Sequence, residues 1–273
     1  MPNIITKLFT LSPRGGMGWG LLLFFLLAIT CTLPTHAKHT QDRIKVLVLS
    51  EGGGQHGPFT RQAMQWLRQR QDSLGIAVTE INNTRPINKQ YLSQFQLIIQ
   101  LDYPPYNWTD EAMAAFQQYI DRGRGGWVGF HHATLLGDFD GFPMSEWFSH
   151  FMGDIRFRSY IAGLCDGALQ VERPSHPVME GVEETFWLED DEWYTFHGNP
   201  RHSAEVEVLA HVDEYSYRPA SDVRMGDHPA VWVNKAKRAR NVYFLMGHSP
   251  KLFQSASFCR MLGNAIRWAG EKK

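Results

Sequence analysis

The fold of this chain is decided by residues 125–134, which read Gly125-Gly-Trp-Val-Gly-Phe-His-His-Ala-Thr134. The apolar part, residues 127–130, has the length and composition of a short strand that is buried on both faces. Two adjacent histidines follow it at a turn. Side chains just beyond the carboxyl end of a central strand point into the crevice where open α/β sheets bind ligands. The stretch therefore predicts a central parallel strand with a candidate site at its end.

The residues before this strand alternate between buried strands and amphipathic helices. Strands are expected at 44–50, 76–81 and 96–101. Helices are expected at 59–74 and at 109–121, and a shorter helix is expected to end at residues 92–95. This β-α-β-α-β-α-β order is typical of a flavodoxin-like, doubly wound and mostly parallel sheet.

The second half of the chain is less regular. Strands are expected at 206–212, 230–233 and 241–246, and the last two suggest an antiparallel pair joined by the basic loop 235–240. Helices are expected at 144–152 and 252–269. Residues 153–200 are rich in turns and aromatics, and we assign no strand there. The expected fold is one α/β domain with antiparallel additions to its sheet.

The N-terminus has the pattern of a secretory signal. Lys7 and Arg14 precede the short apolar run 19–30, and Ala37 ends a small-residue cleavage site. We expect residues 1–37 to be removed and residues 38–273 to form a single secreted or periplasmic domain. A lipoprotein anchored at Cys31 and a membrane anchor are the alternatives, but the run is short for a stable membrane span.

Charge and cysteine content exclude several function classes. The net charge is −1 for the whole chain and −3 for residues 38–273, because Lys7 and Arg14 are then absent. A nucleic-acid partner is not expected without a basic face. Cys165 and Cys259 lie far apart in sequence, have no metal-ligand spacing, and are expected to be separate thiols.

Three polar clusters follow predicted strands, a fourth lies in the stretch 153–200, and all four are expected to form one pocket. They are Gln55-His56, His131-His132, the acidic run 190–192 with Trp193 and Tyr194, and Gly247-His248. Because successive strand residues point to opposite faces, we expect His131 in the pocket and His132 packed away. Among the three acids, Glu192 is expected to point inward because it adjoins two aromatics.

The residue types restrict the chemistry of this pocket. Gly129-x-His131-x-Ala133 has the outline of a nucleophile elbow, but histidine replaces the Ser or Cys, so acyl transfer is not available there. The glycines at 52–54 lack both phosphate-loop patterns, so no nucleotide cofactor is expected. His131 and Glu192 are candidate catalytic bases.

The same cluster contains candidate metal ligands and substrate contacts. His56, His131, Glu192 and His248 have the composition of a site for zinc, or for manganese or iron. Gln55, His132, Trp193 and Tyr194 are candidate substrate-binding residues, and the aromatics offer flat faces to sugar rings. The alternative is that the histidines are structural and the acids form a solvated loop.

Taken in order, the clusters resemble the trehalose-utilisation ThuA-like family over about residues 44–270. The likeness is carried by Gln55-His56, by 128–134 and 175–181 (Ser-His-Pro-Val-Met-Glu-Gly), by 191–194, and by 242–248 (Val-Tyr-Phe-Leu-Met-Gly-His). The resemblance implies a class I glutamine amidotransferase-like fold. His131 and His248-Ser-Pro stand where such amidotransferases carry Cys and His-Pro-Glu, which argues against glutamine hydrolysis. The chain departs from the family at 153–157, where a glycine pair is usual.

The resemblance further implies a function in carbohydrate metabolism. ThuA-like proteins are associated with 3-keto-glycosides made by a partner sugar dehydrogenase, so the expected activity is metal-assisted cleavage or isomerisation of such sugars. A non-catalytic carbohydrate-binding protein, suggested by the missing nucleophile, is the alternative. A Cys-dependent amidase is disfavoured because Cys165 and Cys259 lie outside any elbow.

Overall fold

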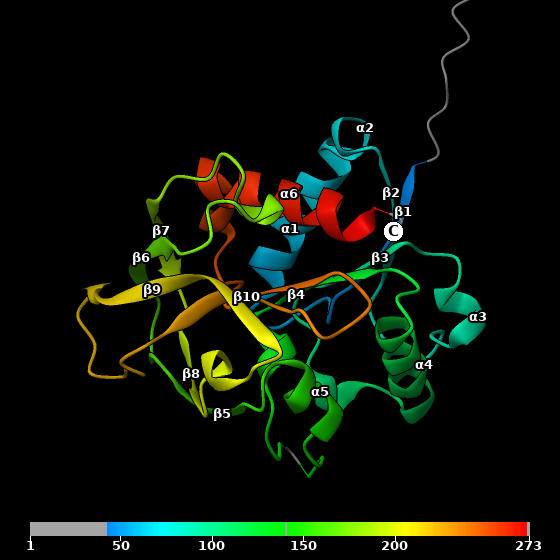
Figure 1. Cartoon of the computed structure of the whole chain (residues 1–273), viewed down its shortest axis with the longest axis horizontal. Coiled ribbons are helices and arrows are strands. Elements are labelled where there is room, and N and C mark those ends of the chain that lie inside the picture. The colour runs from blue at the N-terminus through cyan, green and yellow to red at the C-terminus, as the bar shows by residue number, and fades with distance from the viewer. Residues whose placement is uncertain (1–42, 140, 272–273) are drawn as a thin grey trace, which may run out of the picture. The chain divides into compact units, whose positions relative to one another are not determined.

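The described part of the chain is built around a sheet of nine strands (Figure 1). The computed structural model describes residues 43–139 and 141–271, which belong to the unit formed by residues 40–273. In spatial order the strands are β2 (Ile76–Ile81), β1 (Ile44–Leu49), β3 (Leu97–Gln100), β4 (Gly126–Phe130), β11 (Asn241–Phe244), β10 (Pro229–Asn234), β9 (Val206–Arg218), β6 (Cys165–Val171) and β7 (Thr185–Asp191).

Five neighbouring strands, from β2 to β11, are parallel, and the rest of the sheet is antiparallel. This arrangement confirms the predicted α/β class and the antiparallel pair at the basic loop. The residues of β3, β4 and β11 are buried throughout, as expected for strands with helices on both faces.

Helices cover both faces of the parallel half. Figure 1 shows α1 (Gly57–Gln69), α2 (Gln71–Leu74) and α6 (Ala256–Gly270) on one side of the sheet, and α3 (Lys89–Leu92), α4 (Asp110–Asp121) and α5 (Glu146–Phe151) on the other. The helix expected from residue 109 is confirmed as α4. Thr109 caps its N-terminus, where the side chain accepts a hydrogen bond from the Ala112 amide. No helix among the described residues is long and apolar enough to cross a bilayer. The predicted signal segment 1–37, with Ala37 and Cys31, lies outside the described residues.

The stretch 153–200, where we expected turns, contains four strands. Two of them are β6 and β7 of the main sheet, and the other two, β5 (Arg156–Tyr160) and β8 (Tyr194–His197), form a separate antiparallel pair. The strand expected at 206–212 continues to Arg218 as β9. Cys165 and Cys259 are both free thiols, as predicted.

The antiparallel half brings the end of β7 back to the parallel half. β10, β9 and β6 lie between β11 and β7 in the sheet. Even so, the Asp191 carboxylate at the end of β7 accepts hydrogen bonds from the Gly247 and His248 amides, which follow β11. The sheet therefore curls until the polar residues after β7 meet those after β4 and β11.

Candidate functional site

Four histidines and a glutamate meet beyond the carboxyl ends of the parallel strands. His56 follows β1, His131 and His132 follow β4, His248 follows β11, and Glu192 follows β7. The His56 ring lies at the centre, with centroids 3.9 Å from His132, 4.4 Å from His248 and 5.2 Å from His131. The predicted convergence of the four clusters is thus confirmed.

His131 occupies a strained turn of the elbow type. Its φ angle is 37°, in the left-handed region that side chains other than glycine rarely adopt. The His131 carbonyl accepts hydrogen bonds from Thr134 Oγ1 and Tyr243 Oη, each at 3.0 Å, which fix the turn. Gly247 packs closely against His131, and a Cβ added at Gly247 would lie 2.9 Å from the His131 Cβ.

The expectation that His132 packs away from the pocket was wrong. Both histidines already belong to the 3₁₀ turn η2 (His131–Thr134), so the alternation of a strand does not apply to them. The His132 ring contacts His56, and its Nδ1 donates to the Asp102 carbonyl at 2.7 Å. The other ring nitrogen of His132 is left as an acceptor.

His131 and Glu192 form a contact that requires a proton or a cation. His131 Nδ1 lies 2.9 Å from the Leu245 carbonyl, which can only accept, so Nδ1 carries hydrogen. In a neutral ring Nε2 is then a bare acceptor, yet it lies 3.1 Å from the Glu192 carboxylate. Two acceptors do not attract each other, so the pair holds an additional proton or faces a positive ion.

The other histidines are held neutral by their surroundings. Burial, followed by the neighbouring His132 and His131, lowers the pKa of His56 far below its ordinary value. Burial and His131 lower the pKa of His132 to about 3, and the same two causes lower that of His248. His56 Nε2 is buried without a hydrogen-bond partner among the described residues. Neutral imidazoles with free lone pairs are the form that binds metals.

The acidic run 190–192, at the end of β7, is arranged differently from the prediction. Asp190 lies at the surface and pairs with Lys251, and Glu192 points inward as expected. Asp191 is also inward and completely buried, which sequence reasoning missed. Burial raises the pKa of Asp191 to about 6, although His131 and three backbone amides favour its charged form.

The donor atoms fit a divalent ion. One nitrogen or oxygen from each of His56, Glu192 and His248 lies within 4.8 Å of the others, and the same holds for His56, His131 and His132. His131 and His132 each use Nδ1 to bind a backbone carbonyl, the outer contact that typically orients a metal-binding histidine. The predicted ligands are therefore close together, and His132 joins them.

The candidate substrate contacts separate into two groups. The Tyr194 ring lies 3.9 Å from the His131 ring, and exposed Gln55 adjoins His56. Trp193 is completely buried, donates to the Cys165 carbonyl and packs on Tyr217. The structure thus does not bring Trp193 to the histidine cluster.

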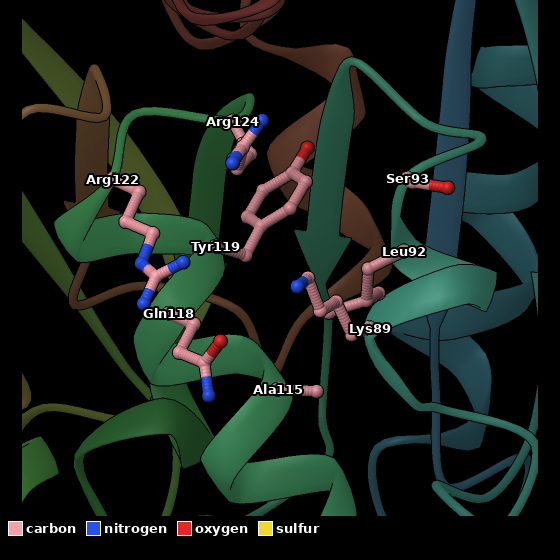
Figure 2. A pocket seen from close by; sticks show the side chains of 8 residues that line it. All are labelled: Lys89, Leu92, Ser93, Ala115, Gln118, Tyr119, Arg122 and Arg124. Atoms are coloured by element: carbon pink, nitrogen blue, oxygen red, sulfur yellow. The ribbon is translucent and has the colours of Figure 1, made fainter.

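A separate groove lies toward the amino-terminal ends of the parallel strands, opposite the end at which the histidines lie (Figure 2). It has a volume of about 250 Å³ between α3 and α4, and its walls include the exposed Lys89, Arg122 and Arg124 beside Tyr119. These residues precede β3 and β4, whereas the histidines follow the strands. The groove contains no histidine or carboxylate, so the histidine cluster remains the candidate active site.

Comparison with known proteins gives a consistent result. The family model described as ThuA, trehalose utilisation, matches residues 45–269. The chain belongs to this family. The ThuA family thereby places it in carbohydrate metabolism and confirms the resemblance predicted from the sequence. A search among curated proteins finds no match.

Solved structures support the ThuA assignment. A ThuA-like protein from Bacteroides uniformis is 27% identical, with a TM-score of 0.75, and the match covers 87% of this chain and 95% of that one. A ThuA-like protein from Parabacteroides merdae is 19% identical with a TM-score of 0.62, and the match covers 84% and 90% of the two chains. The second likeness is evidence for the fold alone.

Proposed function

We propose that this ThuA-family protein is an enzyme that cleaves or isomerises 3-keto-glycosides with the help of a divalent metal. The observation that carries the proposal is the convergence of His56, Glu192 and His248, whose donor atoms all lie within 4.8 Å of one another.

The metal would be held by ligands from His56, His131, Glu192 and His248, beside which His132 also lies. Zinc, manganese and iron all accept this mixture of nitrogen and oxygen donors. When bound, such an ion supplies Lewis acidity to a ketone oxygen. The three lowered histidine pKa values support the proposal, because the imidazoles remain available as ligands over the physiological pH range.

The His131–Glu192 pair would move the proton. A ketone at C3 makes the C2 proton acidic, and Glu192 or His131 removes it. The electron pair forms the C1–C2 double bond as the C1–O bond breaks, and the leaving oxygen takes a proton. Water then adds across the new double bond and completes net hydrolysis. Isomerisation would use the same base and return the proton to a different carbon.

The setting of this activity is also a proposal. Residues 1–37 would export the protein, and a sugar dehydrogenase would supply the 3-keto substrate. This requirement follows from the chemistry, because an ordinary glycoside has no acidic C2 proton.

Metal content is the first test. Purified protein, its His131→Ala and His248→Ala variants, and a His197→Ala control are compared, because His197 is exposed and outside the cluster. We expect about one metal per chain in the wild type and the control, and a clear loss in both cluster variants.

Turnover is the second test. The metal-loaded protein should consume a 3-keto-glycoside and release the leaving group, whereas the parent glycoside should remain intact. Tight binding of both sugars without turnover would instead support the non-catalytic carbohydrate-binding alternative.

A further inference from the structure

We infer that an exposed aromatic platform beside the histidine cluster binds a planar aromatic leaving group, so that aryl glycosides are the preferred substrates. The platform consists of Phe157 and Tyr160 on β5, together with Tyr106, Phe139 and Phe142. This inference rests on the proposed function for the chemistry at C1, but binding to the platform can be measured without it.

The platform is continuous with the proposed catalytic pair. The Tyr194 ring lies 3.9 Å from the His131 ring, and it also contacts Phe157 at 5.0 Å and Tyr160 at 6.5 Å. Phe157 contacts Phe139 at 5.8 Å, which in turn contacts Tyr106 at 5.4 Å. Aromatic rings thus extend from His131 outward to the surface.

A bulge in β5 places the rings of Phe157 and Tyr160 together. Residues three apart on a regular strand point to opposite faces. The register against β8 shifts between Phe157 and Ser159, and the two rings stack with an interplanar angle of 29° and a centroid distance of 6.5 Å. Bulges commonly re-aim a side chain next to a functional site.

Two rings of the platform are exposed to solvent. Tyr160 is 45% and Phe142 47% exposed. The other exposed aromatics of the described chain, Trp187 and Tyr215, each carry an arginine over the ring, Arg218 and Arg224 respectively. Clustered uncovered aromatics mark a binding surface more often than isolated ones do.

The ligand follows from the chemistry of the surface. Flat rings with few hydrogen-bonding groups favour another flat ring through offset stacking. The leaving group is the part of a glycoside bound next to C1, so a phenol on the platform would place the sugar toward His131 and Glu192. A phenolate is also a weaker base than an alkoxide and is expelled more readily in the elimination.

The test measures binding of 4-nitrophenyl and methyl glucosides to the whole protein by titration calorimetry. The variants are Tyr160→Ala, Tyr160→Phe and the control Tyr215→Ala, whose side chain is 87% exposed. We expect the wild type to prefer the aryl glycoside. In Tyr160→Ala this preference should fall roughly three- to ten-fold, whereas Tyr160→Phe and Tyr215→Ala should retain it.

Turnover separates this inference from the proposed function. The 3-keto forms of the aryl glucoside, the methyl glucoside and a disaccharide are compared. Aryl preference in kcat/KM, reduced in Tyr160→Ala, supports the platform. Preference for the disaccharide, equal binding of aryl and methyl glucosides, or an equal loss in Tyr215→Ala would overturn it. Aryl-selective binding without any turnover would retain the platform and reject the proposed reaction.

Discussion

At the scale of single residues, His131 combines a strained backbone with a ring that contacts a carboxylate. A φ of 37° in a side-chain-bearing residue has a conformational cost of about 1–3 kcal/mol. The hydrogen bonds from Thr134 and Tyr243 to its carbonyl and from its Nδ1 to Leu245 offset part of that cost. Their combined effect is to direct Nε2 toward Glu192, which gives the strain a functional reason.

Gly247→Ala should damage the site more than the fold. The new Cβ would lie 2.9 Å from the His131 Cβ, at a φ of 154° that favours glycine. We expect a loss of about 1–3 kcal/mol in the free energy of unfolding and a marked loss of metal affinity. Denaturant unfolding and metal titration would measure both quantities.

The matched control is Gly53→Ala, where an added Cβ meets nothing within 4 Å. It should retain metal binding and stability. Equal behaviour of the two variants would contradict the role assigned to Gly247.

Glu192→Gln should separate stability from activity. The glutamine amide can donate to His131 Nε2, so the pair no longer requires an additional proton or ion, and the melting temperature should be maintained. Turnover of a keto-glycoside should fall by about 10²–10⁴-fold, the usual contribution of a positioned base. Calorimetry and steady-state kinetics would test the two expectations.

The control for this change is Glu189→Gln, whose side chain is 66% exposed. It should leave turnover unchanged. Wild-type rates in Glu192→Gln would remove Glu192 from the proposed mechanism.

At the scale of elements, Arg201 connects three segments of the antiparallel half. Its guanidinium binds Glu172 after β6 with two hydrogen bonds of 2.7 Å, and Asp227 before β10 at 2.7 and 2.9 Å. Burial raises the pKa of Glu172, but hydrogen bonds from Arg201 and His211 outweigh it, and the net pKa is lowered. Hydrogen bonds from Arg201 also lower the pKa of Asp227.

Arg201→Ala should therefore weaken the protein most above pH 4. A carboxylate with a lowered pKa stabilises the fold above its unfolded pKa of about 4, and this contribution is lost as the pH falls through the lower folded value. We expect a loss of about 1 kcal/mol at pH 7, a modest value because these side chains are partly exposed, and a smaller difference from the wild type near pH 3.

Unfolding curves at several pH values would show whether the difference narrows in acid. Arg173→Ala, which removes a more exposed pair with Glu207, is the control and should change little at any pH. A difference that stays constant between pH 7 and pH 3 would mean that the carboxylates do not carry the effect.

Sequence patterns located the elements whose apolar residues form a continuous run or recur at one regular spacing. The continuous apolar runs of β1, β3 and β4 and the Thr109 cap of α4 gave their positions almost to the residue. β5 alternates partly buried with exposed residues and contains a bulge, and β7 is interrupted by a positive φ at Asp190. Short strands with such interruptions have no periodicity distinct from that of loops.

At the scale of the whole molecule, the proposed metal ligands come from widely separated parts of the chain. An ion that binds only the folded protein stabilises it by RT ln(1 + [M]/Kd), about 2.7 kcal/mol at a hundredfold excess over Kd. Zinc or manganese should therefore raise the melting temperature of the apoprotein. The shift should be lost in His56→Ala and kept in His197→Ala, as thermal unfolding with and without the ion would show.

The site itself was predictable only in part. The rule that polar residues follow buried strands was sufficient to find His56, His131 and His248. Glu192 was predicted instead because it adjoins two aromatic residues. The same rule applies to Asp102, which directly follows the β3 region and accepts hydrogen bonds from the Glu51 amide and Thr60. Asp191 depends instead on the curling of the antiparallel half, a long-range property that no local pattern contains.

The pairing of β4 with β11 also determines when the site can form. β4 ends at Phe130 and β11 begins at Asn241, so the strands that carry His131 and the Leu245 carbonyl pair only after the segment between them has been made. Pairing of strands so distant in sequence slows folding, because closing the long intervening segment costs entropy. A chain emerging from the ribosome N-terminus first therefore has no assembled centre until almost its full length is present. The candidate site is thus complete only when the fold is, and a chain truncated before β11 would lack both the Leu245 carbonyl and His248.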